Sequence, residues 1–230
     1  MRIDISKYLT ERYLDSVSKQ EFEGPVVTIS REFGCPAKKI AVKLTTRLNE
    51  LKSPKAKKTE WHWVSKEILA ESAKELGVNP DEIGFVFKYE TRSVMDEILS
   101  SYKKKYYQSE RKIRATISRV IRNIAIEGNV IIVGRGGVSI TRDMDKSFHV
   151  NLEASLDWRA LRISEKHCMS IEEAKKYALN IDKKRAEFRD YFHGKGSDYS
   201  RYDVTFNCMT LSIDNITEAI IKMMQLRGLI

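Results

Sequence analysis

The 230-residue sequence contains few cysteines and no long apolar run. Its three cysteines, Cys35, Cys168 and Cys208, form neither an even set for a disulfide framework nor a zinc-binding spacing. No apolar stretch approaches the roughly 18 residues of a membrane span, and the opening segment MRIDISKYLTERYLD is too polar for a signal peptide. We therefore expect a cytoplasmic protein with reduced thiols and no membrane partner.

Acidic residues are also in the minority. Lys and Arg number 41 against 32 Asp and Glu, which gives a formal net charge of +9. This excess favours an anionic partner, such as a nucleotide phosphate or nucleic acid, but a basic solvated surface has the same composition. No nucleic-acid motif and no basic strand face interleaved with aromatic residues is present, which argues against a nucleic-acid partner.

Short apolar runs alternate with longer amphipathic stretches along the chain. The runs are β-branched or aromatic, as is typical of strands buried on both faces of a parallel sheet, and they lie at residues 26–29, 130–133, 148–152 and 204–206, with 61–64 as a weaker fifth. Helical patterns with recognisable ends lie at residues 36–49, 109–127, 170–191 and 213–226. This alternation predicts an α/β three-layer sandwich, with a mostly parallel five-stranded sheet between helices.

Two segments fall outside this pattern. Residues 3–19 form an amphipathic helical pattern within an N-terminal extension over residues 1–23, ahead of a main domain at 24–230. This helix either docks on its own domain or joins a second copy of the chain in a homo-oligomer. The lysine-rich segment KSPKAKKTE at residues 52–60 is expected to be a surface loop, and a solvated linker explains it better than contact with nucleic acid does.

The first predicted strand runs through SREFGCPAKK into a helix, the context in which backbone N–H groups and a helix dipole hold phosphate. In the register set by strand and helix, the standard G-x-x-x-x-G-K-[ST] loop would place its signature residues at Arg31, Pro36, Ala37 and Lys38, so each is replaced. Pro36 also removes a backbone donor. Lys38 and Lys39 nevertheless occupy the first helical turn, where a cation is unfavourable unless an anion joins it.

Two further groups of arginines follow predicted strands. Gly134, Arg135 and Gly136 end one strand, and the glycines would let a ligand approach while the guanidinium binds phosphate or carboxylate. A tight turn with an exposed arginine is the alternative. Farther along, groups of basic residues share helical faces and could close over a polyphosphate; a solvated face with an Asp–Arg pair is the alternative there. These residues are Arg159, Arg162, Asp182, Arg185 and Arg189.

Four sequence blocks, in order, resemble the cytidylate kinase-like family, a nucleoside monophosphate kinase branch of the P-loop fold. They are VVTISREFGCPAKKIA, NVIIVGRGG, the lid-like pair LDWRALRISEK and SIEEAKKYALNIDKKRAEFRDYFHG at about residues 155–195, and YDVTFNCMTLSIDNITEAI. Together the blocks cover roughly residues 24–227. The resemblance implies ATP-dependent phosphoryl transfer to a nucleoside monophosphate or a similar small phosphate acceptor, with ATP and Mg²⁺ as cofactors.

The resemblance also implies roles for particular residues. The donor phosphates would be held by Ser30, Arg31, Gly34, Lys38 and Lys39, with Lys38 or Lys39 replacing the usual loop lysine. Arg135, between Gly134 and Gly136, would bind the acceptor phosphate. The transferring phosphoryl group would be stabilised by Arg159, Arg162, Arg185 and Arg189, with Asp182 orienting one of them.

Several departures from the family pattern weigh against catalysis. Small residues of the family loop are replaced by Cys35, Pro36 and Ala37 after Gly34, and the acid that usually follows the second strand is Ser65 here. The first turn of the loop helix lacks a hydroxyl for magnesium, and we assign no metal ligand. A catalytically degenerate nucleotide- or anion-binding protein with the same fold therefore remains the alternative.

Cys35 has a second possible role. Its place at a helix start beside two lysines predicts a lowered thiol pKa and raised reactivity. A small residue that fills a serine or glycine position is the simpler interpretation.

Overall fold

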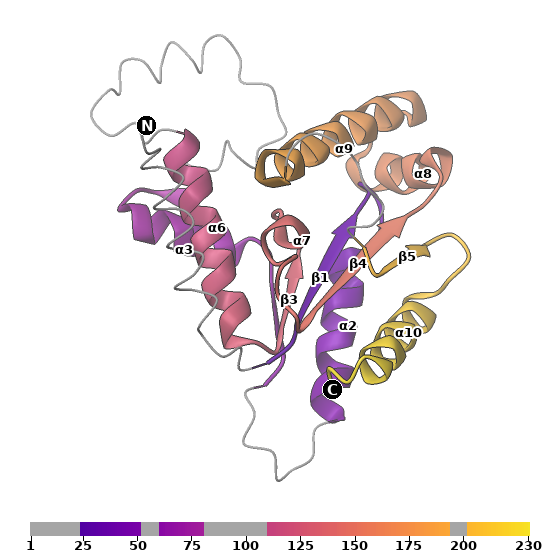
Figure 1. Cartoon of the computed structure of the whole chain (residues 1–230). Coiled ribbons are helices and arrows are strands. Elements are labelled where there is room, and N and C mark those ends of the chain that lie inside the picture. Colours follow the sequence, from indigo (N-terminus) through magenta and orange to yellow (C-terminus); the bar gives the residue numbers. More distant parts are fainter. Residues whose placement is uncertain (1–23, 52–59, 81–109, 194–201) are drawn as a thin grey trace, which may run out of the picture.

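The computed structural model describes residues 24–51, 60–80, 110–193 and 202–230, shown in colour in Figure 1. The predicted helix at residues 3–19, the extension over 1–23 and nearly all of the lysine-rich segment lie outside these ranges. None of the helices within them is long and apolar enough to cross a membrane.

One sheet of five parallel strands forms the centre of the described structure, in the order β2-β3-β1-β4-β5. The strands are β1 (Val26–Arg31), β2 (His62–Val64), β3 (Val130–Val133), β4 (Ser147–Glu153) and β5 (Val204–Asn207). β1 lies in the middle, where Val26 is in register with Val130 of β3 and Ser147 of β4. The parallel sheet predicted from the apolar runs is confirmed, and the weak fifth run is the edge strand β2.

Helices cover both faces of the sheet. They are α2 (Ala37–Glu50), α3 (Glu67–Leu76), α6 (Glu110–Glu127), α7 (Gly137–Ile140), α8 (Leu156–His167), α9 (Ile171–His193) and α10 (Ile213–Leu226). Figure 1 shows α2 and α10 on one side of the sheet and α3 and α6 on the other. This arrangement confirms the predicted three-layer sandwich, although α3 and the short helix α7 after the glycines were not predicted.

The alternation of side chains along each strand supplies a separate core to each face. Val27 and Ile29 of β1 pack in the cluster that includes α2 and α10, whereas Val26 packs in the cluster of α3 and α6. Ile131 and Ile132 of β3 divide between the two clusters in the same way. Strands with apolar residues on both faces are therefore buried on both faces, as the continuous apolar runs predict.

A pair of helices, α8 and α9, lies across the end of the sheet to which β1 and β4 point (Figure 1). The two helices pack on each other through small residues, Ala160, Ala174 and Ala178, together with Ile163. They occupy the region predicted from the lid-like blocks.

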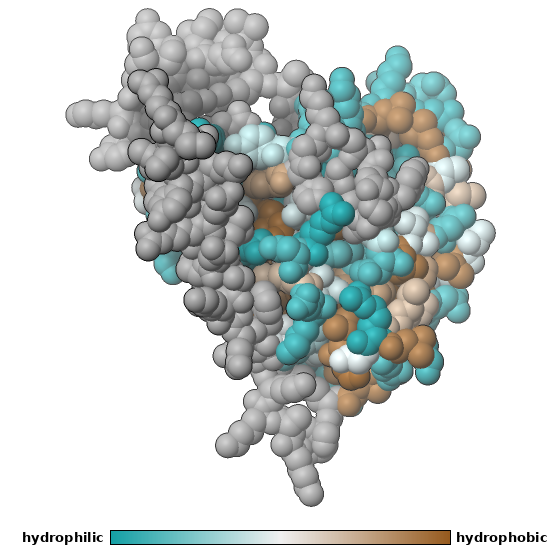
Figure 2. All heavy atoms as spheres, in the orientation of Figure 1, coloured by the Kyte–Doolittle hydropathy of each residue, from teal (hydrophilic) through white to brown (hydrophobic). Residues whose placement is uncertain are grey.

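Hydrophilic residues cover most of the visible face of the described structure. In Figure 2, apolar residues reach the surface mainly over α10 and at the outer end of the α8–α9 pair. Leu226 at the end of α10 is 76% exposed, and Leu161 and Leu179 of the helix pair are also exposed.

Candidate functional site

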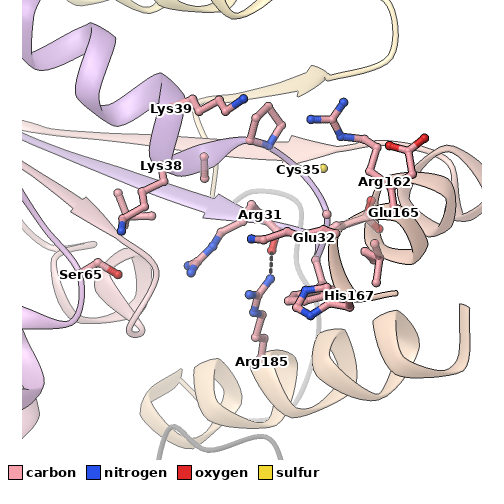
Figure 3. A pocket seen from close by; sticks show the side chains of 17 residues that line it. Arg31, Glu32, Cys35, Lys38, Lys39, Ser65, Arg162, Glu165, His167 and Arg185 are labelled. Carbon is pink, nitrogen blue, oxygen red and sulfur yellow. Dashed lines mark hydrogen bonds between the residues drawn. The ribbon is translucent and has the colours of Figure 1, made fainter. Parts of the chain in front are cut away.

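A cavity of about 630 Å³ opens at the carboxyl end of the sheet. Parallel α/β sheets bind their ligands at this edge. The loop after β1 and the first turn of α2 form one wall, and α8 and α9 form the other (Figure 3). The predicted site residues that line this cavity are Arg31, Gly34, Lys38, Lys39, Arg162 and Arg185. The predicted site residues that do not line it are Ser30, Gly134, Arg135, Gly136, Arg159, Asp182 and Arg189.

Cations reach this cavity from four separate elements. Figure 3 shows Arg31, from the end of β1, Lys38 and Arg185 on one side of the loop, and Lys39 and Arg162 on the other. Arg185 donates from Nη1 to the backbone oxygen of Arg31 at 3.2 Å. Because like charges gathered around one space repel each other, this arrangement favours an anion in the cavity.

The backbone of the loop is already largely engaged within the protein. Four of its N–H groups donate to protein oxygens: Glu32 to Leu152 O at 2.9 Å, Phe33 to Asp182 Oδ1 at 2.7 Å, Cys35 to Glu32 O at 3.2 Å, and Ala37 to Cys35 O at 3.0 Å. Pro36 has no N–H. A standard phosphate loop uses such donors to hold an anion, so here the side-chain cations must supply most of the attraction.

The buried side chain of Arg159 hydrogen-bonds to the β1 loop. Its side chain is 5% exposed, and it donates to Ala154 O at 3.0 Å, to Phe33 O at 3.1 Å and to Asp182 Oδ2 at 2.6 Å. Glu32 Oε2 lies 3.3 Å from its Nε and also accepts from the Ala154 N–H at 3.0 Å. In this structure Arg159 therefore joins the β1 loop to the start of α8 and to α9, outside the cavity lining.

Asp182 of α9 contacts both the β1 loop and Arg159. One of its oxygens accepts from the Phe33 N–H and the other from Arg159, while Arg185 Nη1 lies 3.8 Å from Oδ1. The predicted pairing of Asp182 with arginines of the helix pair is thus present. Its partners make it a positioning group for the loop.

Arg31 brings the two glycine-containing motifs together. A Cβ atom added to Gly134 would lie 1.7 Å from Arg31 Nη1, and Gly134 has a φ of +73°. Only glycine leaves room for this guanidinium at that position. The end of β3 therefore shapes the position of a cavity-lining cation on β1.

Arg135 lies beside the cavity. Its backbone has a φ of 59°, in the left-handed region, and its Nε donates to Ser65 O at 3.2 Å. Ser65 follows β2 and does line the cavity. Arg189 is farther away along α9, where its backbone oxygen accepts from Ser139 Oγ at 3.4 Å.

The last turn of α8 adds lining residues that we did not predict. Glu165, Lys166 and His167 contribute to the cavity wall. The only sequence signal for them is their spacing of three and four residues from Arg162, which puts Glu165 and Lys166 on the same helical face. His167 also lies 6.3 Å, centroid to centroid, from the Phe33 ring in the loop.

The described residues offer little to hold a metal ion. They contain no cluster of three or more His, Cys, Asp or Glu side chains that could bind one. Mg²⁺ in such sites takes one or two carboxylates together with substrate phosphates, but the Glu32 carboxylate already contacts Arg159, and the first turn of α2 carries Lys38 and Lys39 where a hydroxyl would be needed. The donor set does not fit a resident Mg²⁺.

The lowered pKa predicted for the Cys35 thiol is wrong. A hydrogen bond with Cys208 and burial raise the pKa of the Cys35 thiol, and this outweighs its place at a helix start. The same hydrogen bond, with Arg162 nearby, lowers the pKa of Cys208.

The strand order, the parallel sheet and the position of the cavity define a P-loop kinase-like α/β fold. The chain belongs to the cytidylate kinase-like family, whose model matches residues 26–210. The matched region contains the β1 loop, the glycines around Arg135 and the α8–α9 pair.

Solved structures show a similar fold. An uncharacterized protein from Eubacterium ventriosum ATCC 27560 is 23% identical, with a TM-score of 0.59 over 87% of this chain and 98% of that chain. Shikimate kinase from Bacteroides thetaiotaomicron is 12% identical, with a TM-score of 0.50 over 87% of this chain and 98% of that chain. No curated protein matches the chain.

Proposed function

We propose that this protein binds the phosphates of ATP in the cavity and transfers a phosphoryl group to a nucleoside monophosphate or a similar small phosphate acceptor. The observation that carries this proposal is the convergence of cations from β1, α2, α8 and α9 on one cavity at the carboxyl end of the sheet. Membership of a kinase-like family supports the same activity. Such a reaction belongs to the cytoplasm, where its nucleotides are abundant.

Phosphoryl transfer depends mainly on positioning and on charge stabilisation. Lys38 lies on the same side of the loop as Arg31 and Arg185 (Figure 3), so we assign it the role of the missing loop lysine. Arg162 of α8 and Arg185 of α9 would bind the transferring group from the opposite wall, and the α8–α9 pair would serve as the lid. We derive no step through a metal ion, because the donor set does not fit one.

Arg135 is proposed to bind the acceptor phosphate. A residue other than glycine in the left-handed region is strained, and such strain collects at functional sites. Arg135 has this conformation and contacts Ser65, a residue of the cavity wall. The acceptor would then lie between Ser65 and the glycine turn, next to the donor phosphates.

The second candidate is a nucleotide- or anion-binding protein without turnover. The engaged N–H groups of the β1 loop favour it, because they remove donors that would stabilise charge in the transition state. Such a protein would use the same cations and bind the same phosphates.

Calorimetry with ADP and ATP, with and without Mg²⁺, and a coupled assay over a set of nucleoside monophosphates test both candidates. Lys38→Ala and Arg162→Ala should each weaken ADP binding by about tenfold to a hundredfold, the loss expected for one charged hydrogen bond. Lys222→Ala, at an exposed position on α10, is the matched control and should bind as the natural chain does. Turnover supports the kinase, binding without turnover supports the second candidate, and no nucleotide binding contradicts both.

A further inference from the structure

Two of the cations that line the cavity lie over tryptophan rings that are not part of its lining. Lys38 Nζ of α2 is 5.4 Å from the centroid of the Trp63 ring in β2. Arg162 Cζ of α8 is 4.6 Å from the centroid of the Trp158 ring, one turn earlier on the same helix. Both distances lie within the range of about 6 Å over which an aromatic face attracts a cation. The two contacts are on opposite sides of the β1 loop, as the positions of Lys38 and Arg162 in Figure 3 show.

The core of the protein fixes both tryptophan rings. Trp63 and Trp158 are partly buried and pack against the core cluster that includes α2 and α10. Trp63 is also held by the pairing of β2 with β3, where it is in register with Ile131. The Lys38 and Arg162 side chains, in contrast, are exposed. Each contact therefore places a long, exposed cationic side chain against a ring whose position the fold determines.

A tryptophan ring can hold a cation without cancelling its charge. Arg159, one turn from Arg162 on α8, meets the carboxylates of Glu32 and Asp182 and lies outside the cavity lining. The face of an aromatic ring attracts a cation through its quadrupole and carries no net charge. The positive charge of the two cations over rings is therefore not offset by the group that holds them, and it acts fully on an anion in the cavity.

We propose that Trp63 and Trp158 are positioning residues of the phosphate site, whose rings hold Lys38 and Arg162 at the cavity wall and so raise its affinity for phosphates. The contact between rings and cations stands on the geometry alone, and its effect on affinity rests on the proposed function. Long side chains lose rotamer freedom when they bind an anion. A ring that has already restricted the side chain reduces this loss, which is the effect of preorganisation.

The first test observes the two contacts directly, by NMR of the Lys38 ε-CH2 and Arg162 δ-CH2 protons, assigned with the variants Lys38→Arg and Arg162→Lys. Ring currents should move both signals upfield of their ordinary positions in the natural chain. Trp63→Leu should return only the lysine signal to its ordinary position, and Trp158→Leu only the arginine signal. Signals at ordinary positions in the natural chain would overturn the proposal.

The second test measures the effect on affinity, by calorimetry with inorganic tripolyphosphate and with ADP. Trp63→Leu and Trp158→Leu should each weaken binding by about two- to fivefold, the equivalent of one exposed cation–ring contact. Trp63→Phe keeps an aromatic face and should retain most of the affinity. In a Lys38→Ala background, Trp63→Leu should cause no further loss, because the cation that the ring holds is absent. A general loss of structure would instead weaken binding in both backgrounds.

Tyr191→Leu is the matched control, because it removes a ring that lies 4.3 Å from Arg114 Cζ, a cation outside the cavity lining. This variant should bind both ligands as the natural chain does. Unchanged or higher affinity in the two tryptophan variants, or an equal loss with and without Lys38, contradicts the proposal. A natural chain that binds tripolyphosphate but not ADP contradicts the proposed function, while the tripolyphosphate measurements still decide the role of the rings. A chain that binds neither ligand contradicts both.

Discussion

At the residue scale, Gly134 determines how a cation on a neighbouring strand is presented. Its hydrogen atom faces the Arg31 guanidinium, where any Cβ would collide with Nη1. Arg31 in turn lines the cavity. A change at Gly134 should therefore affect anion binding without touching the ligand.

Gly134→Ala should lower the free energy of unfolding by about 1–2 kcal/mol, because alanine is strained at a left-handed φ, and should also weaken ADP binding by displacing Arg31. Gly77→Ala is the matched control: its φ is +67°, but nothing lies within 4 Å of its Cβ position. It should show the same loss of stability with unchanged binding. Urea unfolding and calorimetry measure the two effects. Equal ADP affinities in the two variants would contradict the role given to Gly134.

Arg135 provides a second test at this scale, on the acceptor side of the proposed reaction. Its contact with the rest of the described structure includes the bond to Ser65 O. Arg135→Ala should leave the protein folded and weaken nucleoside monophosphate binding by about 1.5–3 kcal/mol, the value for a hydrogen bond to a charged group. Arg135→Lys keeps the charge but loses the bidentate geometry. Its affinity for a nucleoside monophosphate should therefore lie between that of the natural chain and that of Arg135→Ala. Monophosphate affinity that is unchanged in the alanine variant would show that the acceptor lies elsewhere.

At the scale of elements, the strands could be predicted because four of them are short runs rich in β-branched or aromatic residues. The edge strand β2 gives a weak signal because it is three residues long and half exposed. The short helix α7 was missed because its sequence begins in glycines, which indicate a turn. The ends of α2 and α9 lie within two residues of the predicted positions.

The candidate site could be predicted only in part. Cations after strands and in first helical turns identify a region, since parallel strands bring their carboxyl ends together. Which arginine reaches the cavity depends on tertiary contacts: Arg159 and Arg162 are one turn apart on α8, yet one is buried beneath the loop and the other lines the cavity.

The different positions of Arg159 and Arg162 on α8 predict different effects of their substitution. Arg159→Ala should lower the free energy of unfolding by about 3 kcal/mol, because it removes the nearest cation from Glu32 and from the largely buried Asp182, which keeps only Arg185 Nη1 at 3.8 Å. Arg162→Ala, whose guanidinium lies exposed over the Trp158 ring at 4.6 Å, should change stability by about 0.5 kcal/mol or less. Its ADP binding should weaken instead. Chemical denaturation and calorimetry of both variants decide the matter, and similar stability losses would contradict this division of roles.

At the scale of the whole molecule, the two ends of the sheet differ in their polar chemistry. The carboxyl end carries the cation-lined cavity, and the opposite end carries a smaller polar cavity of about 390 Å³ next to His149. His149 sits inside the sheet, where its ring nitrogens meet Thr28 Oγ1 at 2.7 Å and Ser147 Oγ at 3.1 Å. Burial lowers the pKa of His149 to about 4, the nearby Asp203 carboxylate opposes this shift, and the nearby Arg227 and Arg142 add to it.

This buried histidine should make the stability of the whole fold depend on pH. Because the pKa in the folded protein lies below the ordinary value of about 6.5, the unfolded chain binds the proton more readily between those values. The contribution of His149 is therefore complete above pH 6.5 and decreases as the pH falls toward 4, by about 3 kcal/mol in all. His149→Gln cannot take up this proton, so the stability of the natural chain relative to this variant should fall by that amount between pH 7 and pH 4. Asn123→Ala, at an exposed and non-titrating position on α6, should keep a constant difference from the natural chain. Urea unfolding across this pH range measures both differences, and a constant difference for His149→Gln would show that His149 is protonated as readily in the fold as in the unfolded chain.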